Sequence, residues 1–238
     1  MIEDRVPNHI YQMSTINALV SGLYDGCASL KKLLTKGDFG LGTFEDLDGE
    51  LTLLNGEFYR TRPDGSICKC LEGESVPFAV VTKLENYNEY QIDNCNSYDE
   101  LKKSLDGFID SKNIFYAFYI QGEFNYVKTR TVVKQCRPYR PMTEVVRDQP
   151  IFNYENIEGY IIGFRCPSYV EGLNVPGYHF HFLSKDKKLG GHVSEVSVKK
   201  AKVFVQNCLC FRMELPQSED FYSMKVKNRN DEISEIEK

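Results

Sequence analysis

The sequence predicts an α/β protein, α+β-like in organisation, with two closely packed β-rich parts, mixed β-sheets and a few short helices. Three observations predict this class. Segments of strand length, apolar or alternating, follow one another from Glu50 onward. The helical patterns are short, and each follows a serine that can cap a helix, at Ser14, Ser29 and Ser97. Hydrophobic residues make up 42% of the chain and charged residues 26%, a balance that favours a packed core over disorder.

Two helices are expected near the N-terminus. Ser14 is expected to cap a helix that runs through Leu23 with one apolar stripe. Ser29 is expected to start a shorter helix over residues 30–35. A third helix, Ser97–Phe108, has its apolar residues at helical spacing behind a serine cap.

Strands begin after a glycine-rich stretch. Gly37–Phe44 contains three glycines, which predicts tight backbone turns where chain or ligand comes close. A hairpin follows, in which Asn55-Gly56 joins the strands Leu51–Leu54 and Glu57–Thr61. This dipeptide predicts a hairpin because it supplies the positive φ that a type I′ turn needs. Val76–Leu84 is the next apolar strand.

Further strands follow the third helix. Ile114–Ile120 and Phe124–Val133 flank Gly122, and a period of two residues puts Lys128 and Arg130 on one face of the later strand. The remaining segments are the strands Ile151–Tyr154, Gly159–Phe164, Tyr178–Leu183, Val193–Val198 and Val203–Met213, then a polar, glutamate-rich tail, Asp220–Lys238.

A linker punctuated by Pro138, Pro141 and Pro150 separates the two parts of the chain. The predicted boundary lies near residue 140. The N-terminal part, residues 1–140, then holds a mixed β-sheet with the helices. The C-terminal part, residues 141–238, is β-rich and carries most of the histidines and the C-terminal tail.

The charge and cysteine patterns exclude several classes of partner. The net charge is -5 with no basic block, so neither nucleic acid nor an anionic membrane surface is an expected partner. No apolar run approaches the ~20 residues that cross a bilayer, and the N-terminus lacks the pattern of a signal peptide. The 8 cysteines form no C-x-x-C pair and are expected to be free thiols, which fits a cytoplasmic protein.

Three of the 4 histidines lie close together in the sequence, in Tyr178-His179-Phe180-His181-Phe182 and in Gly190-Gly191-His192-Val193. In a strand, H-x-H aims both imidazoles at the same face. Residues 184–191 read as a hairpin loop that returns His192 beside the first two. Three imidazoles suit Zn²⁺, and three protein ligands leave a position for water or substrate, the catalytic pattern. Histidines that merely pack or lie at the surface remain the alternative, and His9 is expected to be one of these.

Several motifs in the same order resemble the acetolactate decarboxylase family. The metal-binding stretch of that family is matched by residues 172–182 together with Gly190-Gly191-His192-Val193. The other matches are Gly37-Asp38-Phe39-Gly40-Leu41-Gly42-Thr43-Phe44, Leu47-Asp48-Gly49-Glu50-Leu51, Gly56-Glu57-Phe58-Tyr59-Arg60, Thr129-Arg130-Thr131-Val132 and Gln149-Pro150-Ile151-Phe152. The resemblance covers nearly the whole chain, from about Ile10 to the last ten residues.

The resemblance implies roles for the matching residues. His179, His181 and His192 would bind zinc, Glu50 would be an active-site carboxylate, and Arg130 would be the active-site cation.

The resemblance also implies an outer part of the site and an assembly. Thr43 would line the substrate pocket. A glutamate of the tail would reach the site, with Glu237 as the first choice and Glu235 as the second. The family fold is a two-part protein dominated by mixed β-sheet, and a homodimer is expected.

The implied reaction converts a small molecule, 2-acetolactate, into (R)-acetoin and carbon dioxide. Zinc would act as a Lewis acid and stabilise the enediolate that remains when carbon dioxide leaves. Two alternatives stay open from the residues alone. A hydrolase or hydratase would use a zinc-bound water as its nucleophile, and a non-enzymatic metal-binding β-domain would take up metal without turnover.

Overall fold

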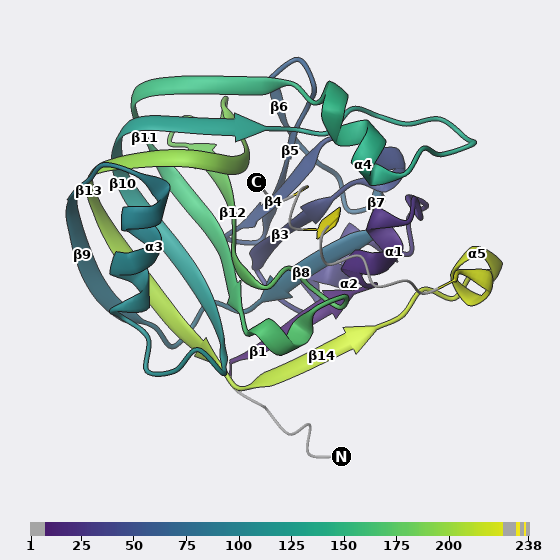
Figure 1. Ribbon diagram of the computed structural model, residues 1–238, viewed down its shortest axis with the longest axis horizontal. Helices are drawn as coiled ribbons and strands as arrows, with labels where there is room; N and C mark the ends of the chain where they lie inside the picture. Colours follow the sequence, from purple (N-terminus) through teal and green to yellow (C-terminus); the bar gives the residue numbers. More distant parts are fainter. Residues whose placement is uncertain (1–7, 226–231, 234–235, 237–238) are drawn as a thin grey trace.

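Two main β-sheets build the protein, and both combine strands from distant parts of the chain (Figure 1). The computed structural model describes residues 8–225, 232–233 and 236. Within these residues the first sheet has the order β14-β1-β8-β3-β4-β5-β6. Its strands are β1 (His9–Met13), β3 (Phe39–Thr43), β4 (Glu50–Leu54), β5 (Glu57–Thr61), β6 (Ile67–Lys69), β8 (Phe78–Thr82) and β14 (Cys210–Glu214). The short strands β2 (Ala28–Ser29) and β7 (Ser75–Val76) pair separately.

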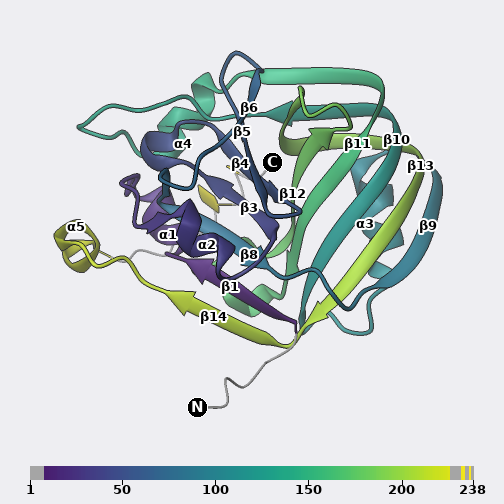
Figure 2. The same cartoon turned by 180° about the vertical axis from the view of Figure 1, so that it is seen from behind.

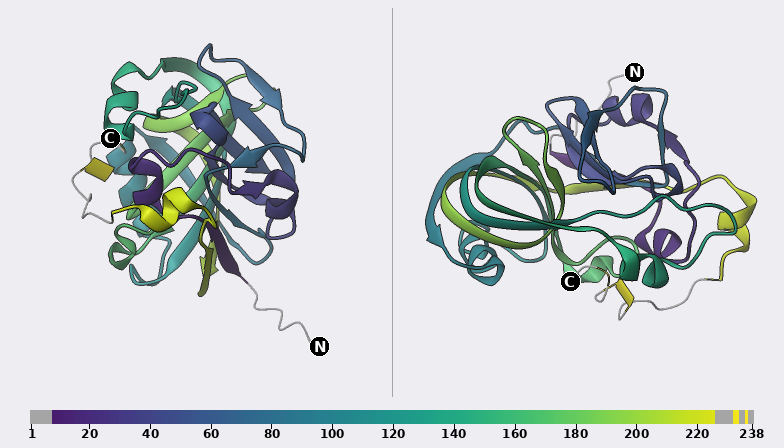
Figure 3. Two further views of the ribbon diagram at one scale, coloured as in Figure 1. Left: turned by 90° about the vertical axis from the view of Figure 1, so that its right-hand side faces the viewer. Right: turned by 90° about the horizontal axis from the view of Figure 1, so that it is seen from above.

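The second sheet is rolled up. Its strands are β9 (Asn88–Cys95), β10 (Phe115–Arg130), β11 (Ile151–Cys166), β12 (Gly177–Ser184) and β13 (Gly190–Cys208). The order is β10-β11-β12-β13-β9, and β10 also pairs with β13. The four strands β10, β11, β12 and β13 therefore close into a ring, whose strong curvature is visible from above (Figure 3).

The helices are short. They are the α-helices α1 (Ile16–Val20), α2 (Leu30–Leu34), α3 (Tyr98–Asp106), α4 (Met142–Val145) and α5 (Glu219–Ser223), with 3-10 turns η1 (Glu45–Leu47), η2 (Val146–Asp148) and η3 (Ser168–Val170). Of these, α2 and α3 pack on the sheets, and α5 stands away from them (Figure 2). The predicted serine caps of α2 and α3 are confirmed: Ser29 accepts a hydrogen bond from the Lys32 amide and Ser97 from the Glu100 amide, both at 3.2 Å.

The predicted first helix is wrong in its cap and its length. Thr15, not Ser14, caps α1, because its hydroxyl accepts from the Ala18 amide at 3.1 Å. Ser14 has a positive φ of 67°, and its amide donates to the Glu214 carbonyl, so it belongs to the connection from β1. The helix ends at Val20 instead of Leu23.

The glycine-rich stretch forms a strand and not the predicted turns, but the predicted close approach of another part of the chain is confirmed. Gly40 and Gly42 lie inside β3, which pairs with β4 and β8. A Cβ atom on Gly40 would lie 2.2 Å from the Val80 carbonyl oxygen of β8. Glycine is needed here for close approach of the neighbouring strand, so its presence did not signal a turn. The Asn55-Gly56 turn is confirmed, with φ angles of 53° and 76°.

Three segments that were expected as pairs of strands are single long strands. Ile114–Ile120 and Phe124–Val133 both fall largely in β10, because Gly122 keeps ladder partners on both sides, Gly159 and Ala201. The same holds for the two segments of β11. The strand β13 contains Val193–Val198 and the first part of Val203–Met213. The last residues of the latter segment belong to β14 of the first sheet. The strands β1, β6 and β9 were not foreseen.

The sheets do not follow the predicted boundary near residue 140. That position lies between β10 and β11, which are neighbours in the ring. From the other end of the chain, β14 pairs in parallel with β1, with His9 opposite Cys210. In the described residues, the chain thus passes from the first main sheet to the ring and returns to the first sheet in β14. All 8 cysteines fall among the described residues and are free thiols, as expected.

The largest hydrophobic cluster joins the two sheets. It includes Phe39, Leu41 and Phe78 from the first sheet and Ile162 and Phe164 from the ring. A second cluster fills the ring around residues such as Phe118 and Phe180, and a third packs α2 on the outer face of the first sheet.

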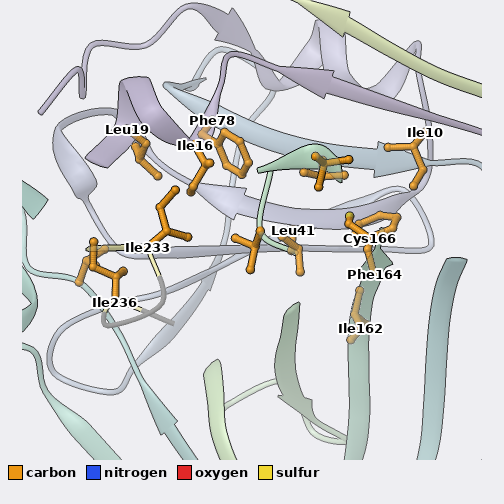
Figure 4. Packing of buried hydrophobic residues seen from close by; sticks show 14 of the residues in the cluster. Ile10, Ile16, Leu19, Leu41, Phe78, Ile162, Phe164, Cys166, Ile233 and Ile236 are labelled. Atoms are coloured by element: carbon orange, nitrogen blue, oxygen red, sulfur yellow. The ribbon is translucent and has the colours of Figure 1, made fainter. Parts of the chain in front are cut away.

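The C-terminal tail adds two residues to the largest cluster. Ile233 and Ile236 are 3% and 2% exposed and belong to the same cluster as Ile16 and Leu19 of α1 (Figure 4). Burial of apolar surface therefore stabilises the position of these two residues.

Replacing Ile233 by alanine should lower the free energy of unfolding by about 2–4 kcal/mol, because it removes a buried side chain from the cluster that joins the sheets. Urea unfolding of the two proteins measures the difference. Leu71→Ala is the matched control, since Leu71 is 78% exposed and its replacement should change stability little. Equal stabilities for Ile233→Ala and the unchanged protein would contradict the packing of the tail.

Candidate metal centre

Three imidazoles converge where the ring closes. His179 and His181 lie two residues apart on β12, so both rings project from one face, and His192 of β13 lies directly opposite His181. The ring centroids are separated by 4.9–5.5 Å. One nitrogen of each ring lies within 4.8 Å of those of the other two. The convergence predicted from the spacing of the three residues is therefore confirmed, and the group has a geometry that could hold a metal ion.

A short hairpin brings the histidines together. The histidine hairpin consists of β12, residues 185–189 and the start of β13. Its ladder has three residue pairs, with His181 and His192 at one end and Leu183 and Gly190 at the other. The turn is closed by Ser184, whose amide donates to the Leu189 carbonyl at 2.8 Å and whose hydroxyl accepts from the Leu189 amide at 3.0 Å.

The three histidines are buried and neutral. His179, His181 and His192 are 9%, 1% and 6% exposed. Burial lowers the pKa of His179 to about 3, and the nearby charge of Arg130 adds to this effect. Burial is also the main cause that holds the pKa values of His181 and His192 well below the usual range, with further contributions from the neighbouring rings and Arg130. Neutral imidazoles keep the lone pairs that metal binding requires.

The first sheet orients one of these rings. Nδ1 of His181 lies 2.8 Å from the carbonyl oxygen of Leu51 in β4. Because a carbonyl only accepts, the proton of this neutral ring is on Nδ1, and Nε2 carries the lone pair. Such a bond fixes the tautomer and orientation of a metal ligand. The Thr52 hydroxyl lies 3.5 Å from the same Nδ1.

Arg130 lies at the end of β10, paired with His192. It is 6% exposed, and its Nη2 donates to Nε2 of His192 at 3.0 Å. Its Nη1 donates to the Gln149 side chain at 3.4 Å, and the described residues offer no acceptor to its Nε. The ladder with β13 is shifted between Lys128 and Thr129, and Lys128 bonds Glu195 near the surface. Lys128 and Arg130 therefore have different surroundings although they share a face of β10.

Glu50 approaches the histidines from β4. It is 9% exposed, and its Oε2 lies 3.6 Å from Nε2 of His181. Thr43 is the cross-strand partner of Glu50, and its hydroxyl donates to the Gly49 carbonyl at 3.0 Å. Thr43 is thus bound to the backbone that leads into Glu50.

The two tail glutamates, Glu235 and Glu237, lie outside the described residues. Two contributors to the site could not be identified from the sequence. Leu51 takes part through its carbonyl group, which leaves no signature in the choice of side chain. Gln149 belongs to one of the motifs that resemble the family, but its contact with Arg130 depends on the loop before β11.

Fold and site together define a class: a protein of two β-sheets with a buried three-histidine centre that can hold a metal ion, beside a buried arginine and a glutamate. The comparisons with known proteins are more specific. The model of the alpha-acetolactate decarboxylase family matches residues 10–228, and the chain belongs to this family.

Relatives and solved structures agree with this assignment. The alpha-acetolactate decarboxylase of Methanosarcina mazei is 40% identical over 239 aligned positions, which cover 100% of this chain and 83% of the relative. That of Bacillus subtilis is 39% identical and covers 95% and 89%. The crystal structure of the enzyme from B. subtilis strain 168 superposes with a TM-score of 0.93 at 38% identity, covering 96% of this chain and 98% of the other. Within the described part of the chain, no helix is long and apolar enough to span a membrane.

The metal-free protein should lose stability as the pH falls below about 6.5, the usual pKa of an unfolded histidine. The three folded pKa values are lower, so the unfolded state binds more protons in this range, and folding is progressively disfavoured down to about pH 3 for His179. Urea unfolding with a chelator present, between pH 7 and pH 5, measures the slope. In His179→Gln the free energy of unfolding should change less steeply with pH, by up to ~1.4 kcal/mol per pH unit. Identical slopes in the two proteins would contradict a lowered pKa for His179.

Proposed function

We propose that this protein decarboxylates 2-acetolactate to (R)-acetoin and carbon dioxide with the help of a zinc ion on His179, His181 and His192. Membership of the alpha-acetolactate decarboxylase family supports the class of reaction, that of a carboxy-lyase. The observation that carries the metal-dependent form of the proposal is the convergence of three neutral imidazoles beside Arg130 and Glu50. The cluster of imidazoles alone suits either decarboxylation or hydrolysis, and membership of the family favours decarboxylation.

The donor set fits zinc. Three nitrogen donors suit this ion, and with three protein ligands it keeps a position open for a substrate. Because the proton of His181 is on Nδ1, its Nε2 is the atom that can bind the metal. In this structure the Nε2 lone pair of His192 accepts a hydrogen bond from Arg130. Bound zinc would supply Lewis acidity, polarising the substrate carbonyl and stabilising the enediolate charge left by carbon dioxide.

Arg130 is proposed to bind the anionic part of the substrate. A buried guanidinium offers a fixed fork of donors that suits a carboxylate, and the described residues leave its Nε without an acceptor. Burial strengthens this attraction because little water competes. Gln149 holds the guanidinium from the opposite side of the fork to His192.

Glu50 is proposed to bind the substrate and deliver the proton that makes acetoin chiral. Its carboxyl group lies at the edge of the imidazole cluster, on a strand whose position Thr43 helps to fix. An acid held on one side of a planar intermediate gives one product configuration. By resemblance, Glu237 is proposed to share this work or to shield the site from water, and Thr43 to line the pocket.

The assembly and location follow from the resemblance as further proposals. A homodimer in the cytoplasm fits the free thiols and the edge strand β14, which is flanked by Leu209 and Leu215, 76% and 49% exposed. An edge strand with apolar neighbours offers a surface on which a second copy can pair.

Purified protein given racemic acetolactate should form acetoin and carbon dioxide, with one enantiomer of acetoin in excess. A chelator should abolish turnover and zinc should restore it. His181→Ala should lose both bound metal and decarboxylation, because one of three ligands is removed. His9→Ala, in β1, is the control and should keep both. A metal-free protein that ignores chelators and still forms acetoin would contradict the proposal.

Arg130→Ala should retain zinc but lose about 10²–10³-fold in kcat, as expected when one electrostatic stabiliser is removed. Metal analysis and an acetoin assay on the same sample separate the two effects. Lys128→Ala is the matched control on the same strand, since its ammonium group bonds Glu195 near the surface. Normal turnover by Arg130→Ala would rule out the anion-binding role.

A further inference from the structure

The turn of the histidine hairpin carries a lysine in an unusual setting. Lys187 lies between His181 and His192 in the chain and is half-buried, whereas the next residue, Lys188, has a side chain that is 78% exposed. Nζ of Lys187 lies 3.9 Å from the ring centroid of Tyr160 and 5.6 Å from that of Tyr59. A cation at these distances is attracted to the faces of aromatic rings, most strongly where water is excluded.

The two rings come from different sheets. Tyr160 belongs to β11 of the ring, and Tyr59 belongs to β5 of the first sheet, where it is 8% exposed. Tyr59 is held by a 2.5 Å hydrogen bond from its hydroxyl to Glu57, whose charge also acts on Lys187. Burial lowers the pKa of Lys187, so the ammonium is partly desolvated and the rings replace part of its hydration.

The position of this turn matters for the imidazoles. The ladder between β12 and β13 has three residue pairs, with the His181–His192 pair at the end away from the turn. Beyond that pair, β12 continues along β11 alone, and β13 continues along β10 and β9. The spacing between the histidines of β12 and His192 of β13 therefore depends on this short ladder and on the turn that closes it.

We propose that Lys187 is a positioning residue for the metal centre: its ammonium, held between Tyr160 and Tyr59, fixes the turn of the histidine hairpin against both sheets and so keeps His181 and His192 at metal-binding distance. The inference rests on the metal site proposed above. Lys187 touches neither substrate nor metal, and it acts through the spacing of the ligands.

The test is zinc affinity, measured by competition with a chromophoric chelator at a temperature where every metal-free variant is folded. Lys187→Met keeps the length of the side chain but removes the charge. Glycine is avoided because φ at this position is +61°, where glycine would also change the backbone preference of the turn. We expect it to bind zinc roughly five- to tenfold more weakly and release it faster. Lys187→Arg and Tyr160→Phe, which keep the cation and the ring, should retain nearly full affinity.

Lys188→Met is the matched control, since it removes the same charge from an exposed position of the same turn. The inference is overturned if Lys187→Met binds zinc as tightly as the unchanged protein, even if it melts at a lower temperature, because that pattern marks a purely structural role. It is also overturned if Lys188→Met weakens binding equally. If the unchanged protein takes up no zinc at all, the metal site itself is refuted and the role of Lys187 with it.

Discussion

The hydrogen bond between Nδ1 of His181 and the carbonyl of Leu51 is the contact on which the arrangement of the centre depends. It joins the ring, which supplies all three imidazoles, to the first sheet, which supplies Glu50 one residue before Leu51. One backbone group thus sets the tautomer of a ligand and the distance of a carboxylate. Because protein interiors are close-packed, the large apolar cluster between the sheets holds this contact in place.

The local part of the site was predictable from the sequence because it is short in range. The H-x-H spacing fixes two rings on one face of a strand, and the turn that follows returns His192 to them. The placement of Arg130 was not predictable in this way. Its strand face, shared with Lys128 in a regular pattern, suggested solvent, but Lys128 bonds Glu195 near the surface whereas Arg130 bonds His192 in the interior. Family resemblance drew attention to Arg130 and Glu50, whereas periodicity alone did not.

For the fold, elements set by nearby residues were foreseen and those set by distant residues were not. The Asn55-Gly56 turn and the caps at Ser29 and Ser97 depend on a few neighbouring positions. By contrast, Gly40 looked like a turn residue because the sequence does not show the strand that packs against it. Likewise, Gly122 interrupts an apolar pattern without interrupting a ladder that has partners on both sides.

The parallel pairing of β1 with β14 has a consequence for biosynthesis. A ribosome releases His9 early and Cys210 late, so this edge of the first sheet lacks its outermost strand until most of the chain has been made. The strands that carry Glu50 and Arg130 also emerge before the histidine hairpin, which comes in the last third of the sequence. During translation, Glu50 and Arg130 are therefore synthesised before the three histidines. The three-histidine centre is among the last interior regions that vectorial synthesis can complete.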